Sequence, residues 1–445
     1  MTGKHRCEPS LWVPAAWARL AAITLTVASC TTLATGSTWY VAPGAGGLGN
    51  AWASPTNLQF ALLNAVTGDD IYLLQGTYAA PAQGFLIDRQ LQLYGGFAGW
   101  ESTPTQRNGG PSILDGGGSS KHVVRLVIAN LPSGTPALLD RFHIRGGNAS
   151  GAAPDDVGGG VYVKGSDVYL IDCFIHSNSA LNKGGGIFVD GHLDTLLGGT
   201  ILNLKRCELT DNIAANGTGT AIGGGIYAKW VVAQVASTAF GTNSAEFRGG
   251  GAFIEDLPAN TSFKFDDCDF WANTVTSSGG AICLGTGGSG LSSTYIYSCS
   301  FSDNYSTTNQ AGRAIYCDTS GTFLTYANIR NSIVWYSYNS PLNTQPPIFG
   351  NTTVNWSDVE TPPHGFAVWP GTGNILADPL FANHGTGRLR IQATSPCIDV
   401  GSSANMGPDG LDLDSDGNTT EPTPLDIEGN ARVNGGQVDM GAHER

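Results

Sequence analysis

The chain is organised by an internal repeat, and no other feature of the sequence restricts its fold as strongly. The pattern Cys-x-apolar-x-x-Asn occurs four times, and one further copy has Thr in place of Cys. The copies occupy residues 173–178, 207–212, 238–243, 268–273 and 299–304. Their asparagines are separated by 34, 31, 30 and 31 residues. A period in this range predicts a solenoid, in which each repeat forms one coil and stacks on its neighbours.

A second pattern, a run of glycines followed by a small or aliphatic residue, alternates with the first. Its copies begin at Gly158, Gly184, Gly223, Gly249 and Gly279, with a weaker copy at Gly312. Each coil therefore contributes one strand around the Cys and another after the glycines, where glycine allows a tight corner. The apolar alternation shifts by one residue before each Cys, as expected where a strand bends. We predict an all-β, single-stranded parallel β-helix in which like residues, among them the Asn amides, form ladders about 4.8 Å apart.

The ends of this solenoid require covers, because exposed strand edges pair with other chains. Ser54 and Pro55 are predicted as the N-cap and first residue of an N-terminal helical cap, followed by a strand at 71–74. The apolar face of that helix comprises Leu58, Ala61, Leu62 and Ala65. We assign residues 36–380 to the β-helix and the acidic stretch 395–445 to a C-terminal cap.

The charge of the chain argues against nucleic acid as a partner. The formal net charge is −14, and charged residues make up only 13% of the sequence. Binding to phosphate backbones requires clustered Lys and Arg, which are lacking here. Glycine, at 62 residues, is about twice as frequent as usual, which indicates an ordered chain with many turns.

The first residues resemble an export signal. Basic residues precede an apolar run at 20–29 that is too short to span a bilayer. We therefore predict a signal peptide at 1–29 and an exported protein, either secreted or held at the cell surface. The run ends in Val-Ala-Ser-Cys30, which resembles the lipobox of bacterial lipoproteins. Two alternatives remain open: lipid attachment at Cys30 as an outer-membrane anchor, or ordinary cleavage near Ala34.

The repeats resemble those of bacterial right-handed parallel β-helix proteins with polymorphic outer-membrane-protein-like repeats. Gly-Gly-Ala-Ile at 279–282 and Phe-x-x-Asn at 270–273 and 301–304 match the two signatures. The ending from Ser395 to Glu444 resembles the region called choice-of-anchor Q. The resemblance implies a right-handed, pectate-lyase-like solenoid at the cell surface, and it implies no particular reaction.

One acidic loop has the spacing of a calcium site. The candidate ligands are Asp412, Asp414, Asp416 and Asn418. They match the first half of an EF-hand loop, in which alternating carboxylates converge on one Ca²⁺. Position twelve is Thr423 instead of Glu, so Glu421 or Asp426 would have to complete the site. A plain acidic loop is the alternative.

The nine cysteines of this chain do not have the arrangement of a disulfide framework or a metal site. Cys173, Cys207, Cys268 and Cys299 occupy one column of the repeat, and no Cys-x-x-Cys spacing occurs. In-register strands constrain the side-chain geometry that a bridge needs. We predict a buried ladder of thiols that pack as small apolar groups.

An aromatic column follows the glycine runs. It comprises Tyr162, Phe188, Tyr227, Phe253, Cys283 and Tyr316. Facing outward, these rings would lie against sugars or a partner surface. Facing inward, they would stack in the core, and the sequence favours this second interpretation.

No catalytic cluster is evident in the columns of the repeat. Asp267 and Asp269 form the densest carboxylate group, and we interpret them as solvated positions of a strand. The sequence therefore favours an adhesive, structural or carbohydrate-binding protein whose partner is an extracellular polysaccharide or another cell-surface component. The alternative is a polysaccharide lyase or glycoside hydrolase, because such enzymes share this scaffold.

Overall fold

The computed structural model describes residues 36–445 except 129–135, 192–198, 259, 287–291, 309, 321–324, 336–344, 362–366 and 385–386. These described residues belong to one compact unit, Gly36–Arg445. The predicted signal peptide and Cys30 lie outside the described residues.

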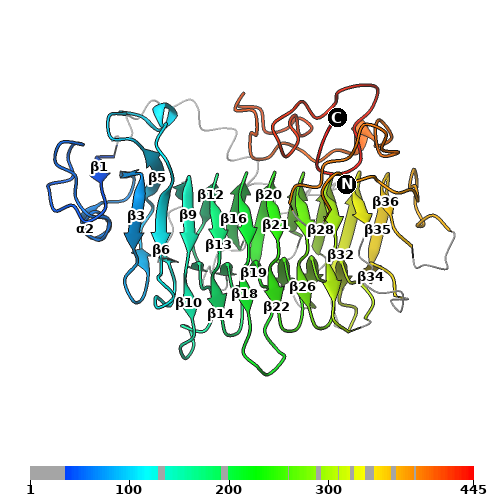
Figure 1. The fold of residues 1–445 in the computed structure, drawn as a ribbon, viewed down its shortest axis with the longest axis horizontal. Coiled ribbons are helices and arrows are strands. Elements are labelled where there is room, and N and C mark those ends of the chain that lie inside the picture. The colour runs from blue at the N-terminus through cyan, green and yellow to red at the C-terminus, as the bar shows by residue number, and fades with distance from the viewer. Residues whose placement is uncertain are drawn as a thin grey trace, which may run out of the picture. The chain divides into compact units, whose positions relative to one another are not determined.

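The described chain forms a right-handed parallel β-helix whose strands make four parallel sheets, here called A to D (Figure 1). A typical coil passes through sheets A, B, D and C in that order before it re-enters sheet A. Sheet A contains β1 (Thr38–Val41), β2 (Asp70–Leu74), β5 (Gln92–Phe97), β8 (Ala137–Asp140), β12 (Val168–Ile171), β16 (Thr200–Lys205), β20 (Val231–Ala236), β24 (Ser262–Asp266), β28 (Ser292–Tyr297), β32 (Thr325–Arg330) and β35 (Thr352–Asn355).

Sheet B follows sheet A around a sharp corner. It contains β3 (Gly76–Ala79), β6 (Ser112–Asp115), β9 (Phe142–Arg145), β13 (Phe174–His176), β17 (Glu208–Thr210), β21 (Ala239–Gly241), β25 (Asp269–Trp271), β29 (Ser300–Ser302), β33 (Ile333–Trp335) and β36 (Asp358–Val359). The residue before each repeat Cys or Thr238 makes this corner. Its φ is positive in every copy: Asp172, Arg206, Ser237, Asp267 and Ser298. This left-handed residue is the physical cause of the shift in apolar alternation seen in the sequence.

Sheets D and C complete the coil. Sheet D contains β10 (Asn148–Ala149), β14 (Ser179–Ala180), β18 (Ile213–Ala214), β22 (Ser244–Ala245), β26 (Thr274–Val275) and β30 (Tyr305–Ser306). Sheet C contains β4 (Phe85–Ile87), β7 (Val124–Val127), β11 (Val161–Lys164), β15 (Ile187–Asp190), β19 (Ile226–Lys229), β23 (Ala252–Glu255), β27 (Ile282–Leu284), β31 (Ile315–Cys317) and β34 (Ile348–Phe349).

The predicted asparagine ladder is confirmed. The side-chain amide of Asn212 donates to the side-chain oxygen of Asn243 at 3.0 Å, and the amide of Asn243 donates to Asn273 at 3.0 Å. Asn178 and Asn304 continue the same ladder at either end. All five side chains are buried, so each coil satisfies the polar groups of the next.

The predicted thiol ladder is also confirmed. Every cysteine that the structure describes carries a free, buried thiol. Cys173, Cys207, Cys268 and Cys299 belong to the apolar core inside the coils. Their thiols reach backbone carbonyls, as in the 3.4 Å contact from Cys268 to Val235.

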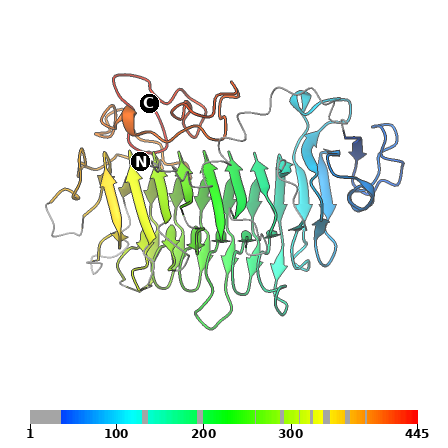
Figure 2. The ribbon, with the colours of Figure 1, turned by 180° about the vertical axis from the view of Figure 1, so that it is seen from behind.

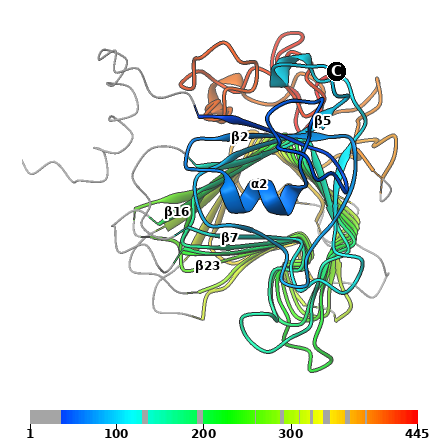
Figure 3. The same ribbon diagram turned by 90° about the vertical axis from the view of Figure 1, so that its left-hand side faces the viewer.

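The N-terminal helix α2 (Leu58–Asn64) lies across one end of the stacked coils (Figure 3). Leu58, Ala61 and Leu62 are buried, as predicted. The predicted N-cap was wrong: Asn57, and not Ser54, accepts a hydrogen bond from the amide of Phe60. The chain before Asn57 is still extended, because Thr56 pairs with Val41 of β1.

The C-terminal segment, defined here as residues 378–445, packs against the outside of the coils (Figures 1 and 2). Its only described helical turn is η2 (Ser403–Asn405), and η1 (Pro104–Gln106) is a similar turn near the other end. The segment and sheet B share an apolar cluster separate from the main core. The cluster includes Ala239, Trp271 and Ile333 from sheet B and Phe381, Leu389, Ile391, Cys397, Ile427, Met440 and Ala442 from the segment.

Candidate functional site

The outer face of sheet C carries a groove that is a candidate site. Within β11, Val161 and Val163 point into the core, and Tyr162 and Lys164 occupy the alternate positions. The in-register pairing places Tyr162 beside Phe188 and Lys164 beside Asp190 on β15. Successive coils therefore build two parallel columns on this face, one aromatic and one charged.

The aromatic column belongs to the outer face and yet is buried. Adjacent rings from Tyr162 through Phe188 and Tyr227 to Phe253 have centroids 5.4, 5.3 and 5.9 Å apart and interplanar angles of 15°, 6° and 13°. They form a cluster distinct from the core inside the coils. Since each ring covers the faces of its neighbours, no free ring face remains for a sugar. The prediction that these rings face the core was therefore wrong, because the alternate residues Val161 and Val163 occupy the core, although the rings do stack on one another.

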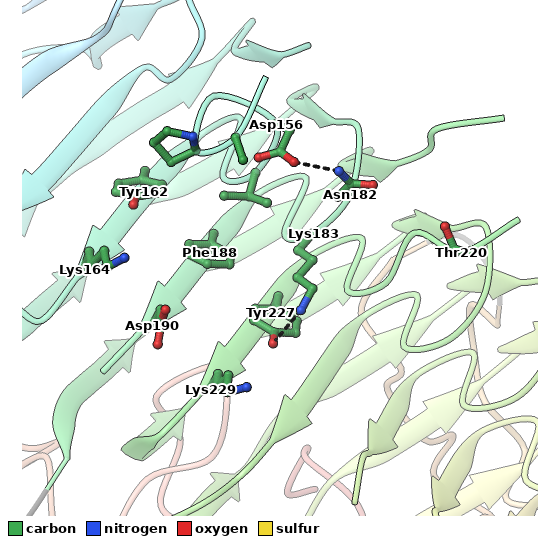
Figure 4. Close-up of a pocket in the computed structure, with 13 residues that line it drawn as sticks. Asp156, Tyr162, Lys164, Asn182, Lys183, Phe188, Asp190, Thr220, Tyr227 and Lys229 are labelled. Carbon is green, nitrogen blue, oxygen red and sulfur yellow. Dashed lines mark hydrogen bonds between the residues drawn. The ribbon is translucent and has the colours of Figure 1, made fainter. Parts of the chain in front are cut away.

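A groove of about 570 Å³ lies over three coils of this face (Figure 4). Its apolar lining comes from Ala153, Pro154, Val157, Tyr162, Phe188 and Tyr227. Its polar lining comes from Asp156, Lys164, Asn182, Lys183, Asp190, Thr220 and Lys229. A hydrogen bond of 2.7 Å between Asn182 and Asp156 joins two of the loops that form its wall.

The charged column alternates in sign along the coils. Lys164, Asp190, Lys229 and Glu255 are consecutive neighbours on β11, β15, β19 and β23. Unlike charges on adjacent strands attract, so the column stabilises its own register. Each of these side chains is partly exposed and accessible to a ligand.

Lys183 links the charged and aromatic columns. Its ammonium group donates to the Tyr227 hydroxyl at 2.9 Å, lies 4.3 Å from the Tyr227 ring centroid and is 3.9 Å from Glu255. The Tyr227 hydroxyl in turn donates to Glu255. Burial, together with the nearby Glu255 carboxylate, raises the pKa of Tyr227 far above its ordinary value. The hydroxyl therefore remains protonated and serves as a hydrogen-bonding group.

The carboxylates considered for catalysis are not solvated, so our interpretation of them was wrong. Asp267 and Asp269 are 1% and 0% exposed. Asp267 pairs with Arg432 at 2.9 Å, and Asp269 pairs with His443 at 2.8 Å. The C-terminal segment covers both groups, which the repeat pattern could not reveal. Neither carboxylate can contact a polymer while the segment is in place.

The predicted calcium loop brings its carboxylates together. Oxygen atoms of Asp412, Asp414 and Asp416 lie within 4.8 Å of one another, and so do those of Asp409, Asp414 and Glu421. Asp414 belongs to both groups. Carboxylate oxygens are the ligands that Ca²⁺ prefers, so this donor set fits a hard cation.

Of the two residues expected to complete the calcium loop, Glu421 lies with the other carboxylates and Asp426 does not. Glu421 belongs to one acidic group, whereas Asp426 accepts hydrogen bonds from the amides of Glu428 and Asn430 and stabilises its own turn. The hydroxyl of Thr423 is buried against the carbonyl of Gly407. The Asn418 amide donates to Glu421 at 3.0 Å.

Asp409 was not predicted as a calcium ligand, because it precedes the sequence motif and comes close to the loop only in the folded chain. Both of its oxygens accept the amide of Leu413, at 3.0 and 2.8 Å. Burial raises its pKa. A nearby ammonium group, that of Lys205, donates to the carbonyl of Leu411 at 3.1 Å and lowers the net negative charge around the loop.

The comparisons with known proteins assign no role to these residues. No family model and no curated protein matches the chain. Among solved structures, the crystal structure of pectate lyase Pel9A is similar, with a TM-score of 0.43 and 11% sequence identity. That match covers 92% of this chain and 96% of the other. Within the described residues, no helix has the length and apolar character needed to cross a membrane.

Proposed function

We propose that this protein is an exported, cell-surface β-helix that binds an extracellular glycan in the groove on sheet C. The groove is the observation that carries the proposal, because three adjacent coils contribute to it and its volume of about 570 Å³ is within the usual range for ligand sites. The coils provide a rigid platform on which the side chains keep fixed spacings.

The chemistry of the groove supports a ligand rich in hydroxyl groups. Ammonium groups of Lys164 and Lys229 donate, the carboxylate of Asp190 accepts, and Asn182 can do both. Hydrogen bonds to charged groups are about twice as strong as neutral ones. The stacked rings in the column beside these side chains supply the apolar part of the lining.

The cellular location is part of this proposal and rests on the N-terminal sequence. A signal peptide at 1–29 would export the chain, and a lipid at Cys30 would tether it to the outer membrane. Intact-mass analysis of the mature protein distinguishes lipidation at Cys30 from cleavage near Ala34. A Cys30→Ala variant that remained in the membrane fraction would contradict the lipid anchor.

A polysaccharide lyase or hydrolase is the second candidate, because two carboxylates, Asp156 and Asp190, line the groove and Glu255 follows Lys229 on the next strand. Such an enzyme would hold a polymer and cleave it. The binding protein would only hold it. The two candidates therefore differ in released products and not in retention.

The test is to incubate the mature protein with neutral and acidic polysaccharides and to record retention on the polymer and release of reducing or unsaturated sugar. We expect retention without release. The Asp190→Asn variant should weaken retention. Glu208→Gln, which changes a half-buried carboxylate on sheet B, is the matched control and should retain normal binding. Release of products that Asp190→Asn abolishes would replace the binding proposal with the enzyme.

A further inference from the structure

We infer that the groove on sheet C selects an uncharged, hydroxyl-rich glycan and discriminates against polyanionic polymers. This inference rests on the proposed function and names the class of ligand for the same groove. Two observations support the inference: the charged column alternates in sign, and two of the lysines that line the groove are already in ion pairs.

The positive charges around the groove are largely compensated. Lys183 lies 3.9 Å from Glu255, and Lys229 pairs with Asp256 at 2.9 Å. Lys164 has no such partner within the described part of the chain, although Asp190 is its neighbour on the next strand. A polyanion needs cations whose charge is free to replace its counterions. Such cations are scarce in this groove.

The negative charges would also repel a polyanion directly. Two carboxylates, Asp156 and Asp190, line the groove together with three lysines, and two of those lysines are paired with Glu255 and Asp256 beside it. The whole chain carries a formal net charge of −14, so its long-range field acts in the same direction. An acidic polymer would have to displace ion pairs before it gained contacts.

A neutral glycan can form hydrogen bonds with the charged column without breaking the existing ion pairs. Adjacent members of the column are about 4.8 Å apart, and they present a donor and an acceptor in turn. A sugar hydroxyl both donates and accepts, so neighbouring hydroxyls can bond to Lys164 and Asp190 or to Asp190 and Lys229. The in-register coils repeat this arrangement along the direction in which a polymer would lie.

The inference is tested by measuring affinity for three neutral polymers, a β-glucan, a xylan and a galactomannan, and for two acidic ones, polygalacturonate and alginate. Each measurement is made at about 50 and 500 mM NaCl, because salt screens exposed charges. We expect one or more neutral polymers to bind with little dependence on salt. The acidic polymers should bind at least about ten-fold more weakly.

Two variants assign the selectivity to the charged column. Asp190→Asn should weaken binding of the neutral polymer about ten-fold, since a hydrogen bond to a charged group contributes about 1.5 kcal/mol. Lys164→Ala should weaken it by a similar factor. Lys264→Ala, on sheet A, removes the same charge elsewhere and should leave affinity unchanged. Circular dichroism confirms that each variant is folded.

The outcomes separate the two proposals. Tight, salt-sensitive binding of an acidic polymer alone would overturn the neutral-ligand inference and leave glycan binding intact. Failure to bind any of the five polymers would overturn both. Neutral binding that neither Asp190→Asn nor Lys164→Ala weakens would overturn the role of the charged column.

Discussion

The coils and the C-terminal segment bury polar groups in opposite ways. In the coils, Asn243 bonds to its equivalents Asn212 and Asn273, so translation from one coil to the next satisfies each amide. In the segment, Arg432 is buried between Asp267 and Glu444 at 2.9 and 3.2 Å. A repeat supplies partners automatically, whereas an irregular segment must pair each buried charge individually.

This difference should appear in how each region responds to loss of one partner. When one residue of the uncharged Asn ladder is substituted, hydrogen bonds are lost. When one residue of a buried ion pair is substituted, its partner remains as a buried charge without a counter-charge. The segment should therefore be the more fragile region and the one more sensitive to solution conditions. The following experiments test that contrast.

The largest effect is expected for Arg432→Met. It leaves Asp267 and Glu444 buried without their cation, which should lower the free energy of unfolding by about 3–5 kcal/mol. Hydrogen exchange should increase in residues 378–445 before it increases in the coils. Arg390→Met is the control, because Arg390 is exposed and pairs with Glu428 at the surface. It should cost less than about 1 kcal/mol. Equal losses of unfolding free energy for Arg432→Met and Arg390→Met would contradict the proposed fragility of the buried ion pairs.

The next effect is a pH dependence that arises where Asp266, on β24 of sheet A, lies near Asp409 of the segment. Burial, with a smaller contribution from the neighbouring Asp409, raises the pKa of Asp266 to about 7 against the lowering effects of Lys264 and Gln234. Tyr297, which has a raised pKa of its own, also faces this carboxyl. Neither oxygen of Asp266 has a hydrogen-bond partner in the described structure.

The direction in which the free energy of unfolding changes with pH depends on which state binds the proton of Asp266 more tightly. The pKa of Asp266 is higher in the folded state than in the unfolded state, so the folded state binds the extra proton. Stability should fall between about pH 4 and pH 7, by about 1 kcal/mol per pH unit, and this group should contribute no further change above that range. Urea denaturation across that range measures the slope. Asp266→Asn should flatten it, and an unchanged slope would assign the dependence to other groups.

A smaller loss is expected within the coils for Asn243→Ala. The substitution removes four ladder contacts, among them the 2.9 Å bond from its amide to the Leu209 carbonyl. It should lower the free energy of unfolding by about 2–3 kcal/mol, with the loss spread over neighbouring coils. Asn328→Ala, on the outer face of sheet A, should cost less than about 0.5 kcal/mol. If Asn243→Ala left the free energy of unfolding unchanged, the ladder would not stabilise the coils.

The smallest effect is expected for calcium. If the acidic loop binds Ca²⁺, millimolar Ca²⁺ should stabilise the segment by about 1–2 kcal/mol through mass action. Asp414→Asn should abolish the effect, because Asp414 belongs to both acidic groups. Asp88→Asn, an exposed carboxylate paired with Arg89, is the control. Calorimetric titration without heat, together with no change in melting temperature, would contradict a calcium site.

Prediction from the sequence succeeded where each coil repeats the chemistry of the last. The Asn ladder, the thiol ladder and the register of the aromatic column were all recognisable, because a fixed period places equivalent residues on adjacent strands. The position of the helix cap was missed because Thr56 pairs with β1, a contact that local propensity does not encode. The groove was missed because loops that carry no repeat build its wall.

The sequence by itself determined the β-helix, since period, alternation and corner glycines act locally within each coil and between neighbours. Only the tertiary structure decided which outer faces are covered. Asp267 and Asp269 are separated by more than 160 residues from Arg432 and His443, and folding brings them together at 2.9 and 2.8 Å. Stacking likewise buries the faces of the outward-pointing rings and leaves the charged column accessible. Solvent exposure depends on every segment that packs against a surface, and local sequence patterns do not contain that information.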